Sequence, residues 1–257
     1  MSFEAIVVER EGALVIITLN RPPANAINRT LVEELARALT ELERDETVRA
    51  LILTGSGDRI FCGGADLGEG FGGDEIESFV KLGQDTLCRI EQFGKPVIAA
   101  LNGHATGGGC ELAMACHLRI MKETARLGQT ESNLGIIPGF GGTQRLPRLI
   151  GRTKALEYLL LGTQIAAAEA LALGLVNRLS NEGETLNDAK ALGRQLAERA
   201  PIATRLTIQC VDRGLNGTIE DGLALERKSF VEVVGTEDAL EGIQAFFQKR
   251  KADFKGK

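Results

Sequence analysis

The sequence predicts an α/β protein with a helical C-terminal region. Short apolar runs typical of buried strands alternate with helical patterns up to about residue 180. From residue 186 onward the helical pattern continues almost to the end of the chain. A chain of 257 residues can bury a large core. We therefore expect an α/β core over residues 1–195 and a helical region over residues 196–257.

Local patterns predict the individual elements. Two apolar runs flank Glu11-Gly12 and predict a hairpin. Thr30 and Glu33 have the spacing of a capping box, so a helix is expected to begin at Thr30. A glycine-rich segment that ends at Gly73 is expected to be mobile, and residues 129–142 a loop. Strands are expected at 5–8, 14–19, 50–54, 97–101 and 118–121, and later helices at 76–93, 143–150, 153–161, 166–173 and 236–254.

Composition argues against several classes of function. A net charge of −5 gives no general signal for nucleic acid or a membrane surface, so neither is expected as a partner. The five cysteines form no C-x-x-C pair, and there are only two histidines. This favours buried thiols in a reducing compartment over disulfides or a metal site. Without a signal-peptide pattern or a long apolar span, the expected location is the cytoplasm.

Residues 95–115 join an apolar run, a glycine-rich loop and a run of good helix formers. Three glycines, Gly107-Gly-Gly109, let another molecule approach the bare backbone. The first N–H groups of a helix lack internal partners and lie at the positive end of its dipole. An amide near Gly108 and the carboxylate of Glu111 are thus offered side by side. By position alone, a simple dipole or capping role for Glu111 remains the commoner interpretation.

A second glycine-rich loop, residues 55–67, also follows an expected strand. Neither loop is a Walker A sequence, because none ends in Gly-Lys-Ser/Thr. Gly139-Phe-Gly141 lacks the third glycine of a dinucleotide fingerprint. The loops therefore do not indicate a binding site for a nucleoside triphosphate or a dinucleotide.

Several short motifs, each modest alone, occur in order and at suitable spacing. They are Asn20-Arg-Pro22, Phe61-Cys-Gly-Gly-Ala-Asp66, Asn102-Gly-His-Ala-Thr-Gly-Gly-Gly-Cys-Glu-Leu112, the stretch from Gly128 to Leu146, and Phe247-Gln-Lys-Arg-Lys-Ala-Asp-Phe254. Together they resemble the enoyl-CoA hydratase/isomerase (crotonase) superfamily over essentially the whole chain. The resemblance implies a spiral of ββα units, with C-terminal helices that support a homotrimer or a dimer of trimers. It also implies an acyl-CoA substrate, with no cofactor besides the coenzyme A of that substrate.

The resemblance implies that two backbone N–H groups stabilise a thioester enolate. By position these belong to Gly63 and Gly108. Both positions at which hydratases of the family carry glutamate are glutamate here, Glu111 and Glu131. Proximity to a helix N-terminus favours Glu111 as the ionised base for water and leaves Glu131 to deliver the proton. The two roles could also be reversed or shared.

Coenzyme A requires groups for its phosphates and its pantetheine arm. Arg21 and the Lys249-Arg-Lys251 cluster are candidates for the phosphates, the cluster across a subunit boundary. A solvated surface charge is the competing interpretation for each. The expected coenzyme A-binding residues are Arg21, Gly63, Gly64, Ala65, Asp66 and Lys249.

Two glutamates favour a hydro-lyase that adds water across the 2,3 double bond of a trans-2-enoyl-CoA, a reaction of fatty acid β-oxidation. The alternatives are a Δ3,Δ2-enoyl-CoA isomerase, which in related enzymes keeps only the equivalent of Glu131, and a non-catalytic acyl-CoA-binding protein. His104 and Thr106 differ from residues frequent in the family, which leaves the length and branching of the acyl chain open. Cys110 is expected to be a packing residue.

Overall fold

The chain builds two sheets and adds strands to them alternately. The computed structural model describes residues 3–66, 68 and 74–257; the mobility expected for the segment that ends at Gly73 concerns residues outside this set. A six-stranded sheet has the order β1 (Ile6–Glu11), β2 (Leu14–Leu19), β3 (Ala50–Gly55), β5 (Val97–Leu101), β7 (Leu118–Lys122), β10 (Arg178–Ser180). A four-stranded sheet has the order β4 (Ile60–Cys62), β6 (His104–Thr106), β8 (Arg126–Gly128), β9 (Ile165–Ala166).

Helices follow the paired strands. They are α1 (Arg29–Arg44), α2 (Asp74–Glu91), α3 (Gly108–Ala115), α4 (Gly142–Ile150), α5 (Arg152–Leu161), α6 (Ala167–Ala172), α7 (Thr185–Ala197), α8 (Pro201–Gly214), α9 (Ile219–Val234) and α10 (Glu237–Gln248), with a 3-10 helix, η2 (Glu131–Leu134). Three successive units, β3-β4-α2, β5-β6-α3 and β7-β8-η2, each send their first strand to the large sheet and their second to the small one. The expected spiral of ββα units is confirmed.

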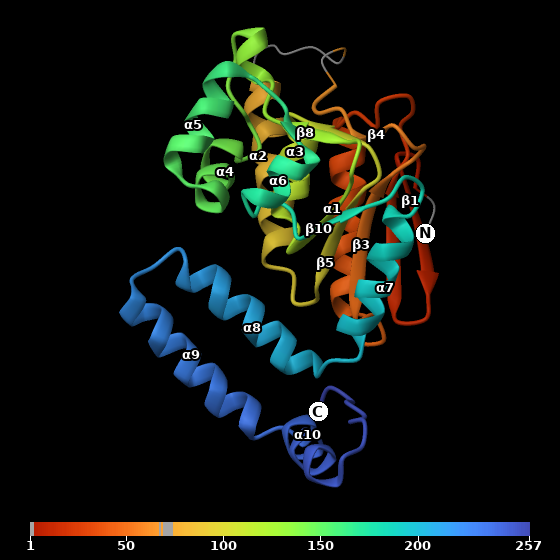
Figure 1. The fold of residues 1–257 in the computed structure, drawn as a ribbon, viewed down its shortest axis with the longest axis vertical. Helices are drawn as coiled ribbons and strands as arrows, with labels where there is room; N and C mark the ends of the chain where they lie inside the picture. Colours follow the sequence, from red (N-terminus) through yellow and green to blue (C-terminus); the bar gives the residue numbers. More distant parts are fainter. Residues whose placement is uncertain (1–2, 67, 69–73) are drawn as a thin grey trace.

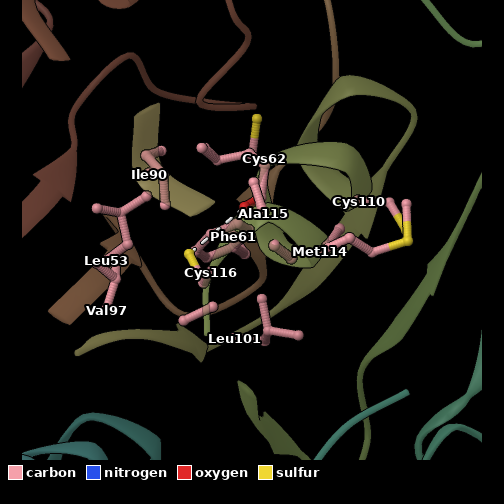
Figure 2. Close-up of a cluster of buried hydrophobic side chains, with 14 of the residues drawn as sticks. Leu53, Phe61, Cys62, Ile90, Val97, Leu101, Cys110, Met114, Ala115 and Cys116 are labelled. Carbon is pink, nitrogen blue, oxygen red and sulfur yellow. Dashed lines mark hydrogen bonds between the residues drawn. The ribbon is translucent and has the colours of Figure 1, made fainter. Parts of the chain in front are cut away.

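The core is built on both faces of the large sheet. Strands β3 and β5 are buried along their whole length, as continuous apolar runs in parallel sheets are. Helix α7 covers one face, where Leu192 packs with Ile52 and Ile98. On the other face, side chains of β3, β4, α2, β5 and α3 pack together in a second cluster (Figure 2). This cluster also includes buried residues of the small sheet.

Several element boundaries differ from those expected. Helix α1 begins at Arg29 because Asn28 is its N-cap and accepts a hydrogen bond from Leu31 N at 2.9 Å. The capping box expected at Thr30 is therefore wrong. Helix α10 ends at Gln248, since Lys249 adopts the left-handed conformation with φ 53°. The strands of the small sheet were not predicted.

The C-terminal helices extend away from the sheets. Helices α8 and α9 form an antiparallel pair that projects from the core, and α10 lies beyond them at the far end of the molecule (Figure 1). Helix α7 still packs on the large sheet to Ala197, so the division expected after residue 195 would fall within its last turn. That division stays a prediction. None of the described helices is both long and apolar enough to cross a bilayer.

Candidate active site

The site lies where three neighbouring strands of the small sheet end. Strands β4, β6 and β8 are adjacent and parallel, so their carboxyl ends meet at one edge. The loop 63–66 follows β4, Gly107 and the N-terminus of α3 follow β6, and Gln129 to Glu131 follow β8. The topology therefore brings together residues that are far apart in the sequence.

Backbone contacts hold these loops against one another. Thr106 Oγ1 donates to Gly63 O at 3.1 Å, and Gly107 N donates to Gly128 O at 2.9 Å. A Cβ at Gly64 would lie 3.4 Å from Gly108 N, so the first two loops are in contact. A Cβ at Gly107 would lie 3.2 Å from Glu131 Oε1, which places that carboxyl beside the start of α3.

The amides at this edge that have no acceptor among the described residues include Gly108 N, in the first turn of α3, and Ala65 N. The peptides on either side of Ala65 are fixed, because Ile27 N donates to Gly64 O at 2.7 Å and Asp66 N donates to Ile27 O at 2.8 Å. The prediction for Gly63 needs correction. Its N–H donates to Ala24 O at 2.8 Å, so this amide is already engaged within the protein.

Glu111 is a buried carboxyl held by a turn of the chain. Only 1% of the residue is exposed, and its Oε1 accepts hydrogen bonds from Phe140 N at 2.8 Å and Gly142 N at 2.6 Å. Burial raises the pKa of Glu111 to about 7; the Gly142 amide opposes this, and the charge of Glu131 adds to it. The ionised form is therefore less favoured than the helix N-terminus alone suggested, and Glu111 exchanges its proton near neutral pH.

Glu131 opens η2 and is half-buried on the other side of Gly107. Burial also raises the pKa of this carboxyl, against hydrogen bonds from backbone amides. With its side-chain nitrogen facing Glu131, the buried Gln129 donates to Oε1 at 2.9 Å and to Oε2 at 3.1 Å. The site therefore holds two carboxyl groups, each fixed by its own donors, beside two unpartnered amides.

Arg21 and Asp66 form an ion pair beside the 63–66 loop. Arg21 Nη2 lies 3.0 Å from Asp66 Oδ2, and the Arg21 side chain holds the pKa of Asp66 below its usual range. Both residues line a cavity of about 420 Å³ that continues along residues 20–26. The predicted coenzyme A residues Arg21, Gly63, Gly64, Ala65 and Asp66 thus lie together in the structure.

Comparisons with known proteins agree with this geometry. The profile of the Enoyl-CoA hydratase/isomerase family matches residues 9–257. The chain belongs to the enoyl-CoA hydratase/isomerase family. It is 43% identical to a short-chain-enoyl-CoA hydratase of Clostridium acetobutylicum, over 98% of each chain. It is 42% identical to a crotonyl-CoA hydratase of Syntrophomonas wolfei, over 99% of each chain. A crystal structure of an enoyl-CoA hydratase from Bacillus anthracis superposes with a TM-score of 0.96 at 41% identity, covering 99% of this chain and all of that one.

Lys249, the remaining predicted coenzyme A residue, is not brought to this edge within the chain. It directly follows α10, and α10 lies at the opposite end of the molecule from β4 (Figure 1). The C-terminal helices project from the core, so a Lys249 contact with coenzyme A requires a neighbouring copy of the chain.

Some groups that form this site were not among the site residues expected from the sequence. They are Gln129 and the Phe140 and Gly142 amides that hold Glu111. Ala65 was expected to bind coenzyme A, but its free amide was not predicted. The glycine-rich run after Pro138 was a usable signal, since it marks a turn whose backbone can approach another group.

The two other side chains considered at the sequence level have structural contacts. Arg126 N donates a hydrogen bond to His104 Nδ1 at 3.1 Å, which joins the first residues of β8 and β6. Cys110 is fully buried, and burial raises the pKa of its thiol far above neutrality, which fits a packing role. Within residues 3–66, 68 and 74–257, no three His, Cys, Asp or Glu residues are grouped as metal ligands.

Proposed function

We propose that this protein is an enoyl-CoA hydratase, a hydro-lyase that converts a trans-2-enoyl-CoA and water to a 3-hydroxyacyl-CoA. One observation carries the proposal: Glu111 and Glu131 flank the start of α3, next to the unpartnered amides of Gly108 and Ala65. The relatives named as short-chain-enoyl-CoA and crotonyl-CoA hydratases support the same reaction.

The two amides supply the electrophilic part of the reaction. The thioester oxygen accepts hydrogen bonds from Gly108 N and Ala65 N, and negative charge moves onto that oxygen as water adds. Ala65 takes the place predicted for Gly63, whose amide is bonded to Ala24. Each donor to a developing oxyanion contributes on the order of 100- to 1,000-fold in rate.

The two carboxyl groups move the protons. Glu111 accepts a proton from water as the water oxygen bonds to the β-carbon, and Glu131 gives a proton to the α-carbon. Transfer of one proton from Glu111 back to Glu131 through solvent restores both groups, so the net change is the addition of one water. A pKa of about 7 suits Glu111 to exchange protons near neutrality, and burial, which raises the pKa of Glu131, favours the protonated form that a proton donor needs.

Coenzyme A is the part of the substrate through which the protein binds it, and no further cofactor enters this scheme. The cavity beside Arg21 and Asp66 and the backbone of the 63–66 loop accommodate its adenine and pantetheine parts. Lys249 of an adjacent copy reaches the phosphates.

The assembly that we propose is a homotrimer or a dimer of trimers, formed through residues 196–257. The C-terminal helices leave large apolar side chains in water, a pattern that marks an interaction surface. They include Leu215, Ile219, Phe230, Val231, Leu240, Ile243, Phe246 and Phe247. Light scattering on purified protein tests this: a monomeric mass at working concentration contradicts it.

The cytoplasm is the proposed location and β-oxidation the proposed pathway. All five cysteines are free thiols, and three of them are buried, which suits a reducing compartment.

The decisive assay follows the loss of the conjugated thioester absorbance of crotonyl-CoA. Glu111→Gln and Glu131→Gln should each lower kcat by at least about 100-fold, because each removes a proton-transfer group. Normal turnover in either variant contradicts the proposal.

The family's name also covers isomerases, so that reaction is the second candidate. An isomerase would convert a 3-enoyl-CoA without taking up water and would tolerate Glu111→Ala. Incorporation of oxygen from ¹⁸O-labelled water into the product of the wild-type protein separates the two. Tight acyl-CoA binding without turnover would instead indicate a non-catalytic binding protein.

A further inference from the structure

The turn at residues 138–142 determines where the carboxyl of Glu111 lies. Phe140 N and Gly142 N both donate to Glu111 Oε1, at 2.8 Å and 2.6 Å. Glu111 Oε2 makes no hydrogen bond to the described part of the chain, which leaves it for water or substrate. Any movement of this turn therefore moves the carboxyl, and near-attack geometry is sensitive to shifts of about 1 Å.

Arg145 binds the same turn from its other side. The residue is 8% exposed, and its Nη1 donates to Phe140 O at 2.8 Å. Gly141 adopts φ 106°, and a Cβ there would lie 2.4 Å from Arg145 Nη1. The shape of the turn and the position of the guanidinium are thus coupled, and the turn has room for both only because residue 141 is glycine.

Helix α2 fixes the guanidinium in turn. Arg145 Nη2 donates to Glu91 Oε2 at 3.1 Å and lies 3.5 Å from Cys88 Sγ. The same helix grips the turn directly, since Gln84 Nε2 donates to Gly139 O at 2.8 Å. A planar guanidinium can bond in two directions at once, to the turn and to α2, whereas a lysine ammonium makes a single point contact.

We propose that Arg145 is a positioning residue for Glu111: it ties the Phe140–Gly142 turn to α2, so that the two amides of the turn hold the carboxyl in place for water attack. Every hydrogen bond that its side chain makes within the described residues is to the turn or to α2. The inference rests on the proposed hydration, in which Glu111 activates water.

The charge of Arg145 has a measurable second effect. It lowers the pKa of Glu111, opposing burial and the charge of Glu131. Other titratable groups line the cavity of about 580 Å³ that borders the guanidinium, and they are unchanged in the Arg145 variants. They are Cys88 and Glu91 of α2, His117 between α3 and β7, Arg119 of β7, Arg148 of α4, and Asp212 of α8.

The test compares Arg145→Gln, Arg145→Lys and a matched control, Arg148→Gln. Arg148 lies on the same helix and borders the same cavity, but within the described part of the chain its side chain bonds only to Gln144. Arg145→Gln should lower kcat on crotonyl-CoA by on the order of 100-fold with little change in KM. The rising limb of its kcat/KM pH profile should move to higher pH, because the charge that favours ionised Glu111 is gone.

Arg145→Lys keeps the positive charge but cannot bond to the turn and to α2 at the same time. The rising limb of its kcat/KM pH profile should return to the wild-type position, while kcat stays well below wild type. Arg148→Gln should match wild type in both kcat and pH profile. A purely structural role predicts instead that Arg145→Gln loses rate only in proportion to folded protein, with the pH limb unmoved; that result overturns the proposal. If Arg145→Gln does not fold, Arg145→Lys decides, and a wild-type kcat there overturns it.

Glu111→Gln, assayed in parallel, separates this inference from the proposed function. Normal turnover in Glu111→Gln removes the hydration scheme itself. An inactive Glu111→Gln together with an unaffected Arg145→Gln leaves hydration in place and removes only the role of Arg145. Titration of the ¹³C-labelled carboxyl of Glu111 by NMR in the Arg145 variants provides a readout that does not depend on turnover.

Discussion

The side-chain amide of Gln129 lies against the carboxylate of Glu131 and can donate to both of its oxygens, at 2.9 Å and 3.1 Å. Gln129 is 1% exposed, so no water replaces these hydrogen bonds if the amide is removed. Donors to a carboxylate favour its ionised form and fix its orientation. The proton donor of the proposed reaction therefore depends on a neighbour two residues earlier in the chain.

Gln129→Met tests this dependence with a side chain of similar volume. We expect kcat on crotonyl-CoA to fall by on the order of 10-fold, because Glu131 loses both orientation and support for its ionised product state. KM should change little, since Gln129 does not line the cavity beside Arg21 and Asp66 that we propose for coenzyme A. Steady-state kinetics measures both, with Gln195→Met, a change at an exposed residue of α7 on the large sheet, as the control. Unchanged kcat would show that Glu131 is oriented without Gln129.

The sequence predicted the strands and helices with their own strong patterns. Strand β3 begins with four apolar residues in a row and β5 consists of five, so the burial of both strands follows from composition alone. Strands β4, β6 and β8 are three residues each, too short for any periodicity to appear. Their existence depends on pairing with one another, which a local pattern does not contain.

The site divides in the same way. Glu111, Glu131 and Gly108 were predicted from motifs, and the structure places them together. The choice of Ala65 over Gly63 depends on Ala24 O, a partner far away in the sequence that only the folded chain supplies. Tertiary contacts therefore determine which of several adjacent amides remains free, and the local sequence does not contain them.

Gly108→Val tests the amide at the start of α3. A Cβ at Gly108 would lie 3.2 Å from Phe140 Cδ2 and 3.3 Å from Ile27 Cδ1. A branched side chain must therefore either displace Phe140 or occupy the space that the thioester oxygen needs to reach the Gly108 amide. We expect kcat to fall by at least about 100-fold, the value typical of losing one oxyanion donor. Gly214→Ala on α8 is the control, because a Cβ there has only an ordinary 3.7 Å contact with Gly222 Cα. Near-normal turnover in Gly108→Val would argue against this amide as a donor.

Arg21→Gln tests the coenzyme A cavity. Arg21 is paired with Asp66, so part of its charge is already compensated, and we expect a moderate effect. KM for crotonyl-CoA should rise by roughly 3- to 10-fold with kcat unchanged, the pattern of lost uniform binding. Crotonyl-pantetheine, which lacks the adenine nucleotide, should show equal KM for the variant and the wild type. A matching rise in KM for both substrates would place Arg21 away from the phosphates.

Glu111→Gln should stabilise the protein above neutral pH while abolishing activity. The folded-state pKa of Glu111, about 7, lies above its ordinary value of 4.5, so the folded state binds the proton more tightly than the unfolded state. The contribution of Glu111 to stability is therefore greatest below pH 4.5, falls as the pH rises toward 7, and stays lowered above that. The loss amounts to on the order of 3 kcal/mol. Glutamine accepts the same two amide hydrogen bonds without this loss.

The measurement is the difference in Tm between Glu111→Gln and wild type at pH 5 and at pH 8. At roughly 2–4 °C per kcal/mol for a chain of this size, the variant should melt several degrees higher at pH 8 and close to wild type at pH 5. Glu123→Gln, an exposed glutamate, serves as the control for loss of one negative charge. A Tm difference independent of pH would mean that burial of the Glu111 carboxylate does not limit stability, and the electrostatic cost assigned to this site would then be wrong.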